Sequence, residues 1–174
     1  METPLIIDLP NQVRSGWESS TIEPLSRQTG QFKNRIGAEI VKHVLTEQNV
    51  SCFVDENNNL NFKENKVSEI RTSFASINGN RKTFWFNQIR PKLDNWSYLH
   101  LVCIHPEKVE VYEYTKYETL ELCKDAAGLD HIGQDGDLLA ISVFQTKNKG
   151  NYWKLDCYGK KIAEFSTNKI KLNE

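Results

Sequence analysis

Glu69 and Arg71 form a pair whose residue types and spacing could do chemistry in this 174-residue chain. They belong to residues 66–74, K-V-S-E-I-R-T-S-F, in which Val67 and Ile70 favour extended backbone. Side chains alternate along a strand, so Glu69 and Arg71 would share one face, about 7 Å apart. A carboxylate beside a cation can hold a divalent metal and a phosphate at one point. The ordinary alternative is a solvated strand face with a weak ion pair.

A second acid, Glu39, lies in a predicted helix that precedes this strand. The segment 31–48 carries a broad apolar stripe at helical spacing and predicts the best helix in the chain. Glu39 falls on the edge of that stripe, four residues before His43. Both residues also have a non-functional interpretation. An acid at the edge of an apolar stripe usually faces water, and a histidine there is usually partly buried in the packing of the helix.

A third polar position lies in the turn between the helix and the strand. Residues 50–54 and 60–62 read as short strands, and residues 55–59, D-E-N-N-N, have turn chemistry. With the strand 66–74 they predict an antiparallel meander of two or three strands after the helix. Asp55 opens the turn, fourteen residues before Glu69, and Asn61 lies in the second short strand.

The remaining pattern predicts an α+β fold with a mixed central sheet flanked by helices. The apolar run 96–104 indicates a buried strand, and 108–114 alternates as a half-exposed strand. A short helix over 117–127, a strand over 138–146 and a hairpin around Gly159 follow. We expect one domain, made of an N-terminal arm (1–30), a core (31–130) and a C-terminal β element (131–174) that completes it.

The composition limits which classes of function the protein can have. The hydrophobic content of 39% supports a real core, and the net charge of −1 means that any nucleic-acid contact must come from local patches. Residues 145–174 form one such patch, with seven lysines against three acids, or +4.

The four cysteines show no zinc spacing and suit a reducing cytosol. Without an 18-residue apolar window or a leader pattern, we expect a cytoplasmic protein that does not span a membrane.

With these features together, residues 31–114 resemble the PD-(D/E)xK nuclease superfamily, which has the restriction-endonuclease-like fold. The phrase F-W-F-N-Q-I-R-P (84–91), the run W-S-Y-L-H-L-V (96–102) and the following V-x-V-Y strand are similar to prokaryotic and phage proteins of this class. The resemblance implies a DNA endonuclease, such as a restriction-modification enzyme, that uses Mg²⁺ with Mn²⁺ as a possible substitute. Such enzymes usually cut double-stranded DNA as homodimers.

The resemblance assigns roles residue by residue. Glu69 matches the acid and Arg71 the lysine of the (D/E)xK strand, and Glu39 matches the helical acid, so Glu39, Asp55 and Glu69 would bind the metal. Asn61 is an alternative to Asp55 at the first acid position. Arginine stays protonated and carries protons poorly, but it can hold a phosphate or orient the attacking water. With Asn61 in that position, the chain would be a degenerate pseudo-nuclease that binds DNA or a protein partner.

Several basic and amide side chains are candidates for contacts with DNA, because arginine, lysine and glutamine read phosphates and base edges well. The candidates are Arg81, Lys82, Gln88, Arg90 and Lys154. Non-functional interpretations exist as well: Arg90 could cap a turn, and the lysines near the C-terminus could simply keep a surface hairpin soluble. A plain α/β interaction domain with no nucleic-acid role is the remaining alternative.

Overall fold

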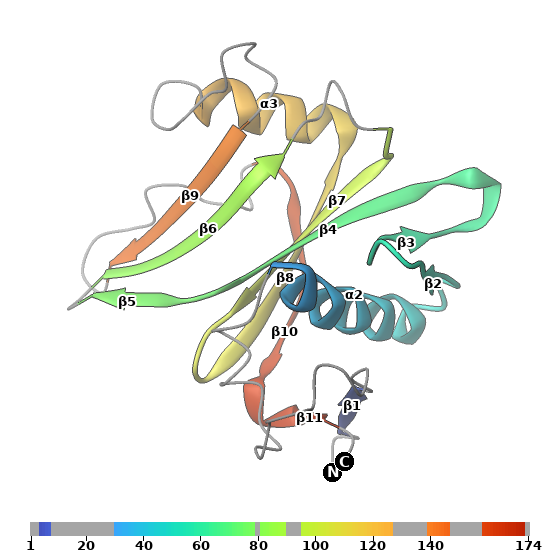
Figure 1. Cartoon of the computed structure of the whole chain (residues 1–174), viewed down its shortest axis with the longest axis horizontal. Helices are drawn as coiled ribbons and strands as arrows, with labels where there is room; N and C mark the ends of the chain where they lie inside the picture. The colour runs from blue at the N-terminus through green and yellow to red at the C-terminus, as the bar shows by residue number, and fades with distance from the viewer. Residues whose placement is uncertain are drawn as a thin grey trace.

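The structure is a computed structural model that describes residues 4–7, 30–78, 81–89, 95–126, 139–146 and 158–172. These residues have a mixed α/β architecture in which strands dominate and two described helices flank them, compatible with the predicted α+β class (Figure 1). In chain order the elements are β1 (Leu5–Ile7), α2 (Gly30–Glu47), β2 (Phe53–Val54), β3 (Leu60–Asn61), β4 (Val67–Phe74), β5 (Ser76–Asn78), β6 (Arg81–Ile89), β7 (Tyr98–Ile104), β8 (Lys108–Thr115), α3 (Lys116–Ala126), β9 (Leu139–Thr146), β10 (Lys160–Ser166) and β11 (Ile170–Leu172).

The main sheet has six strands in the order β10-β8-β7-β4-β3-β2. The predicted meander is present, because β2 pairs with β3 and β3 with β4, both antiparallel. Strand β4 then runs parallel to β7 over the register from Ser68↔Tyr98 to Phe74↔Ile104. This parallel pairing requires a crossover, and the crossover contains β5 and β6 of a second sheet, β5-β6-β9 (Figure 1).

Helix α2 covers one face of the main sheet and forms the first core with it. Its apolar stripe, including Ile36 and Ile40, packs with Ile70 of β4 and Val102 of β7. The helix approaches β4 so closely at Gly37 that an added Cβ would collide with the side chain of Thr72. The predicted helix is therefore confirmed, and the glycine in it has a packing role.

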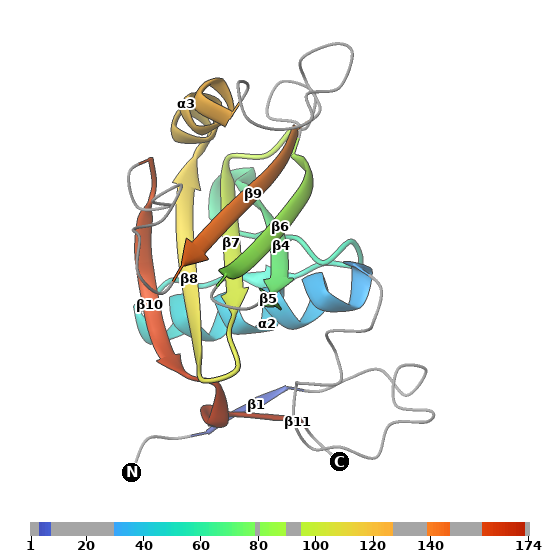
Figure 2. The same ribbon diagram turned by 90° about the vertical axis from the view of Figure 1, so that its left-hand side faces the viewer.

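The opposite face of the sheet is covered by β6 of the second sheet (Figure 2). Phe84, Phe86 and Ile89 of β6 form a second core with Leu99 and Leu101 of β7. Residues paired across a parallel ladder point to the same side. Because β4 pairs Glu69 with Leu99 and Arg71 with Leu101, both polar side chains lie on this second face.

The C-terminal strands attach to the rest of the fold at two places. Strand β10 pairs antiparallel with β8 and so extends the main sheet, while residues 152–157 of the predicted hairpin lie outside the described residues. Strand β11 pairs in parallel with β1, and the buried side chains of Leu5, Ile7 and Ile170 join the first core. Of the predicted arm, the structure describes residues 4–7 and 30. A search of the described helices finds none with the length and apolar content to span a membrane.

Candidate functional site

The predicted acid and cation of β4 contact each other. Glu69 Oε1 lies 2.5 Å from Arg71 Nη2, and Arg71 Nη1 donates to the carbonyl oxygen of Ile70 at 3.3 Å. The side chains of Glu69 and Arg71 are 12% and 23% exposed, so the pair is largely desolvated but still reaches solvent. The guanidinium of Arg71 thus contacts both the carboxylate of Glu69 and a backbone carbonyl of the same strand.

The two candidates for the first acid position, Asp55 and Asn61, lie together. Asp55 Oδ1 accepts from the backbone N–H groups of Asn57 (2.9 Å) and Asn59 (3.0 Å), and Asp55 Oδ2 accepts from Asn61 Nδ2 (2.8 Å). The register pairs Asn61 with Val67, so Asn61 shares the face of Glu69. Asp55 therefore organises its own turn and touches the same edge of the sheet through Asn61.

Glu39 is set apart from these residues. It belongs to α2, which packs against the opposite face of β4, and its carboxylate pairs with Arg35 at 3.2 Å. Over the part of the chain that the structure describes, no group of three or more His, Cys, Asp or Glu side chains could hold a metal ion. The expected gathering of three acids around Arg71 is thus not present among these residues.

The two predicted metal acids that remain are Asp55 and Glu69. Mg²⁺ is commonly held by one or two carboxylates and keeps several waters. Asp55 Oδ2 and Glu69 Oε1 are each held by a side chain, Asn61 and Arg71 respectively, and a side chain can rotate away more easily than backbone. A three-acid shell that includes Glu39 does not fit the arrangement, because Glu39 lies on the opposite side of β4, and binding of Mg²⁺ by Asp55 and Glu69 stays a prediction from the sequence.

The expected DNA contacts are only partly placed. Arg81, Lys82 and Gln88 belong to β6, where Arg81 pairs with Asn78 of β5 and Thr146 of β9. Arg90 and Lys154 lie outside the described residues. Their contact with DNA stays a prediction from the sequence.

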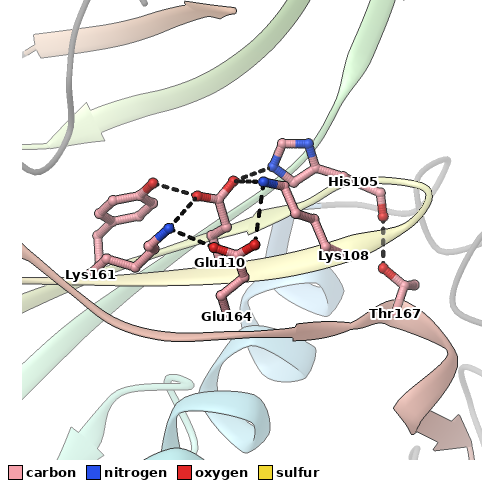
Figure 3. A network of polar contacts seen from close by, with 7 residues as sticks. His105, Lys108, Glu110, Lys161, Glu164 and Thr167 are labelled. Atoms are coloured by element: carbon pink, nitrogen blue, oxygen red, sulfur yellow. Dashed lines mark hydrogen bonds and ion pairs between the residues drawn. The ribbon is translucent and has the colours of Figure 1, made fainter.

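A buried polar cluster, which the sequence did not reveal, joins β8 to β10 (Figure 3). Glu110 is 4% exposed; its Oε1 lies 2.6 Å from His105 Nε2, and its Oε2 accepts from the hydroxyl of Tyr112 at 2.7 Å. Lys108 and Lys161 lie 3.6 Å from the carboxylate. The prediction that β8 is half-exposed is wrong here, because Val109 and Val111 belong to the first core and Tyr112 belongs to the second, so both faces of this strand are covered.

The electrostatics of this cluster indicate a structural role. Burial would raise the pKa of Glu110, but hydrogen bonds from His105 and Tyr112 and the charge of Lys108 outweigh it and lower the pKa to about 2. Lys161 also pairs with Glu164 of β10 at 2.6 Å, and Thr167 donates to the carbonyl oxygen of His105 (Figure 3). The groups of the cluster thus bind one another and tie β10 to the β7–β8 hairpin.

A second series of hydrogen-bonded side chains contains the residue types of a hydrolase triad. Ser68 Oγ lies 2.5 Å from His100 Nδ1, and His100 Nε2 lies 2.9 Å from Glu113 Oε2. The hydrogen bond with His100 lowers the pKa of Glu113, and the charge of Lys160 acts in the same direction. Ser68 is completely buried, so no substrate can reach its hydroxyl. The three hydrogen-bonded side chains instead hold β4, β7 and β8 together.

Comparisons with protein-family models, with curated proteins and with solved structures found no match to this chain.

Proposed function

We propose that the protein is a Mg²⁺-dependent DNA endonuclease of the restriction-endonuclease-like class, with Glu69 and Arg71 at its centre. The observation that carries the proposal is the ion pair between these side chains on a central strand, whose neighbour β3 carries Asn61, the hydrogen-bond partner of Asp55. An acid and a cation that neutralise each other in the free protein are also the groups that a metal ion and a phosphate would separate. Glu69 would turn to the metal, and Arg71 to the phosphate.

The chain's own residues would then have distinct tasks. Asp55 and Glu69 would hold the ion, which when bound supplies charge stabilisation and an activated water. Arg71 would bind and orient the scissile phosphate, because a guanidinium is planar and stays protonated. It cannot serve as the general base, so the proton of the attacking water would pass to solvent. A homodimer would place two such sites on opposite strands of a duplex.

The direct test is plasmid cleavage with Mg²⁺ or Mn²⁺ by the wild type and by Glu69→Ala. We expect metal-dependent nicking by the wild type and at least a hundredfold loss in the variant, as for loss of a group that stabilises transition-state charge. Glu64→Ala is the matched control, because Glu64 is an exposed acid paired with Lys66 close by, and it should cleave normally. Equal cleavage by Glu69→Ala and the wild type would refute the assignment.

The second candidate is a degenerate pseudo-nuclease that binds DNA without cleaving it. The hydrogen bonds of Asp55 within its own turn and the ion pair of Glu69 with Arg71 favour it, because both carboxylates already have partners that a metal must displace. A gel shift on duplex DNA without cleavage in any metal would favour this candidate. The absence of any shift at low salt would instead favour an interaction domain unrelated to nucleic acid.

A further inference from the structure

Phe53 is a large apolar side chain that the core does not use. It is 61% exposed on β2, the last strand of the main sheet, while its neighbour Val54 packs against the first core. The alternation of the strand explains the difference, because Val54 points toward α2 and Phe53 points to the opposite face. Folding therefore requires an apolar residue at position 54, and the ring at position 53 is left for another role.

The exposed ring lies on the same face as the candidate site. The ladders pair Phe53 with Asn61 and Asn61 with Val67, so these three side chains form one row across β2, β3 and β4. Glu69 and Arg71 follow Val67 on this face of β4. With strands about 5 Å apart and about 7 Å between alternate residues, Phe53 lies roughly 12 Å from Glu69.

Along this face the side chain at the edge is the most exposed. Phe53 is exposed, Asn61 and Val67 are half-buried, and the side chains of Glu69 and Arg71 are 12% and 23% exposed. A ligand whose charged group reaches Arg71 would thus extend outward over polar and apolar atoms to the ring of Phe53. A nucleic acid strand has this composition, with a phosphate at every step and a flat base attached to each.

We propose that Phe53 is a stacking platform for an unpaired base of a nucleic acid whose backbone reaches Arg71. The inference rests on the proposed function insofar as this face must bind nucleic acid, whether or not it cleaves it. Bases stack well on aromatic rings, and the stacking tolerates any base. In a duplex the faces of each base are covered by its neighbours, so the ring would favour a single-stranded or frayed segment over intact duplex.

The test is fluorescence anisotropy of a labelled oligo(dT) and of a labelled hairpin duplex, both in EDTA to prevent cleavage. We expect Phe53→Ala to weaken binding of oligo(dT) about tenfold and leave duplex binding nearly unchanged, as for loss of one stacked base. Phe53→Tyr should retain binding because it keeps the ring. Tyr117→Ala is the matched control, since Tyr117 is an aromatic residue 71% exposed on α3, and it should bind like the wild type.

Different outcomes distinguish the role of Phe53 from the proposed function of the site. If Arg71→Ala weakens oligo(dT) binding and Phe53→Ala does not, the stacking platform is refuted and the nucleic-acid site stands. If the wild type binds neither probe, the inference fails, and plasmid cleavage with Mg²⁺ then tests the proposed function separately. If Phe53→Ala instead converts an oligomer to a monomer in size-exclusion chromatography with unchanged oligo(dT) binding, the ring is a protein contact and the inference is overturned.

Discussion

At the scale of single residues, the central fact is that Arg71 holds two oxygen atoms at once. Its guanidinium contacts the carboxylate of Glu69 and the carbonyl of Ile70, which a lysine ammonium would not hold in the same planar geometry. A charge-assisted contact in a largely desolvated place is stronger than one in water. Any cation that binds Glu69 must compete with this contact, so metal affinity and phosphate affinity should be coupled.

Replacement of Arg71 by methionine should therefore have opposite effects on the two ligands. We expect Mg²⁺ to bind Arg71→Met about tenfold more tightly, because the guanidinium no longer competes for Glu69, while oligonucleotide binding weakens. Isothermal titration calorimetry measures the first effect and anisotropy the second. Arg35→Met is the control, because Arg35 pairs with Glu39 on the other side of the sheet. Unchanged Mg²⁺ affinity in Arg71→Met would show that the ion does not bind at Glu69.

At the scale of elements, α2 and β4 depend on close contact at Gly37. A Cβ at this position would meet the side chains of Thr72 and Ile70, and Asn34 of the same helix accepts from the backbone N–H of Thr72 at 2.9 Å. This hydrogen bond satisfies a strand group beyond the last described pair with β3 at Ser68. The helix thus serves both as cover for the core and as a partner for the edge of β4, directly behind Glu69 and Arg71.

The contact predicts that Gly37→Ala is destabilising although alanine is the better helix former. Helix propensity alone would stabilise the variant by about 1 kcal/mol. The collision with Thr72 should outweigh this and lower the free energy of unfolding by about 1–3 kcal/mol. Urea denaturation measures the change, with Thr46→Ala on the exposed side of the same helix as control. A more stable Gly37→Ala variant would mean that Thr72 can move aside without cost.

At the scale of the whole molecule, two imidazole–carboxylate pairs, one buried and one half-buried, connect the strands on both faces of the β7–β8 hairpin. His100 with Glu113 lies on the α2 side, and His105 with Glu110 lies on the side of the second core. Lys160 and Lys161 of β10 reach Glu113 and Glu110 respectively. Ion pairs therefore hold the edge strand β10 against β8. The stability of the fold should depend on the ionisation of the two carboxyl groups, Glu110 and Glu113.

Acid should weaken this fastening in a defined range of pH. The pKa of Glu110 is lowered from 4.5 to about 2 in the folded protein. A lowered carboxyl pKa contributes stability that is fully present above the unfolded value and lost as the pH falls from about 4.5 toward 2. The contribution is up to about 3 kcal/mol. Urea midpoints between pH 7 and pH 3 should fall less steeply in Glu110→Gln, which starts less stable. Parallel curves would contradict the role of Glu110.

Local patterns in the sequence were sufficient for the elements around the candidate site. The stripe from Ile36 to Val44 predicted α2, the D-E-N-N-N turn predicted the meander, and the apolar run 96–104 predicted β7. Each signal is a periodicity or a turn composition that acts over a few residues, so the sequence contains it completely. The shared face of Glu69 and Arg71 follows from the same two-residue period.

Only the tertiary structure decided what depends on residues distant in the sequence. It paired β4 in parallel with β7, placed Glu39 behind the sheet that carries Glu69, and buried Glu110 on β8, next to β10. No local pattern could indicate these positions, because the burial of a side chain depends on which other segment covers it. Periodicity tells which residues share a face, whereas sheet order and helix packing determine which faces meet.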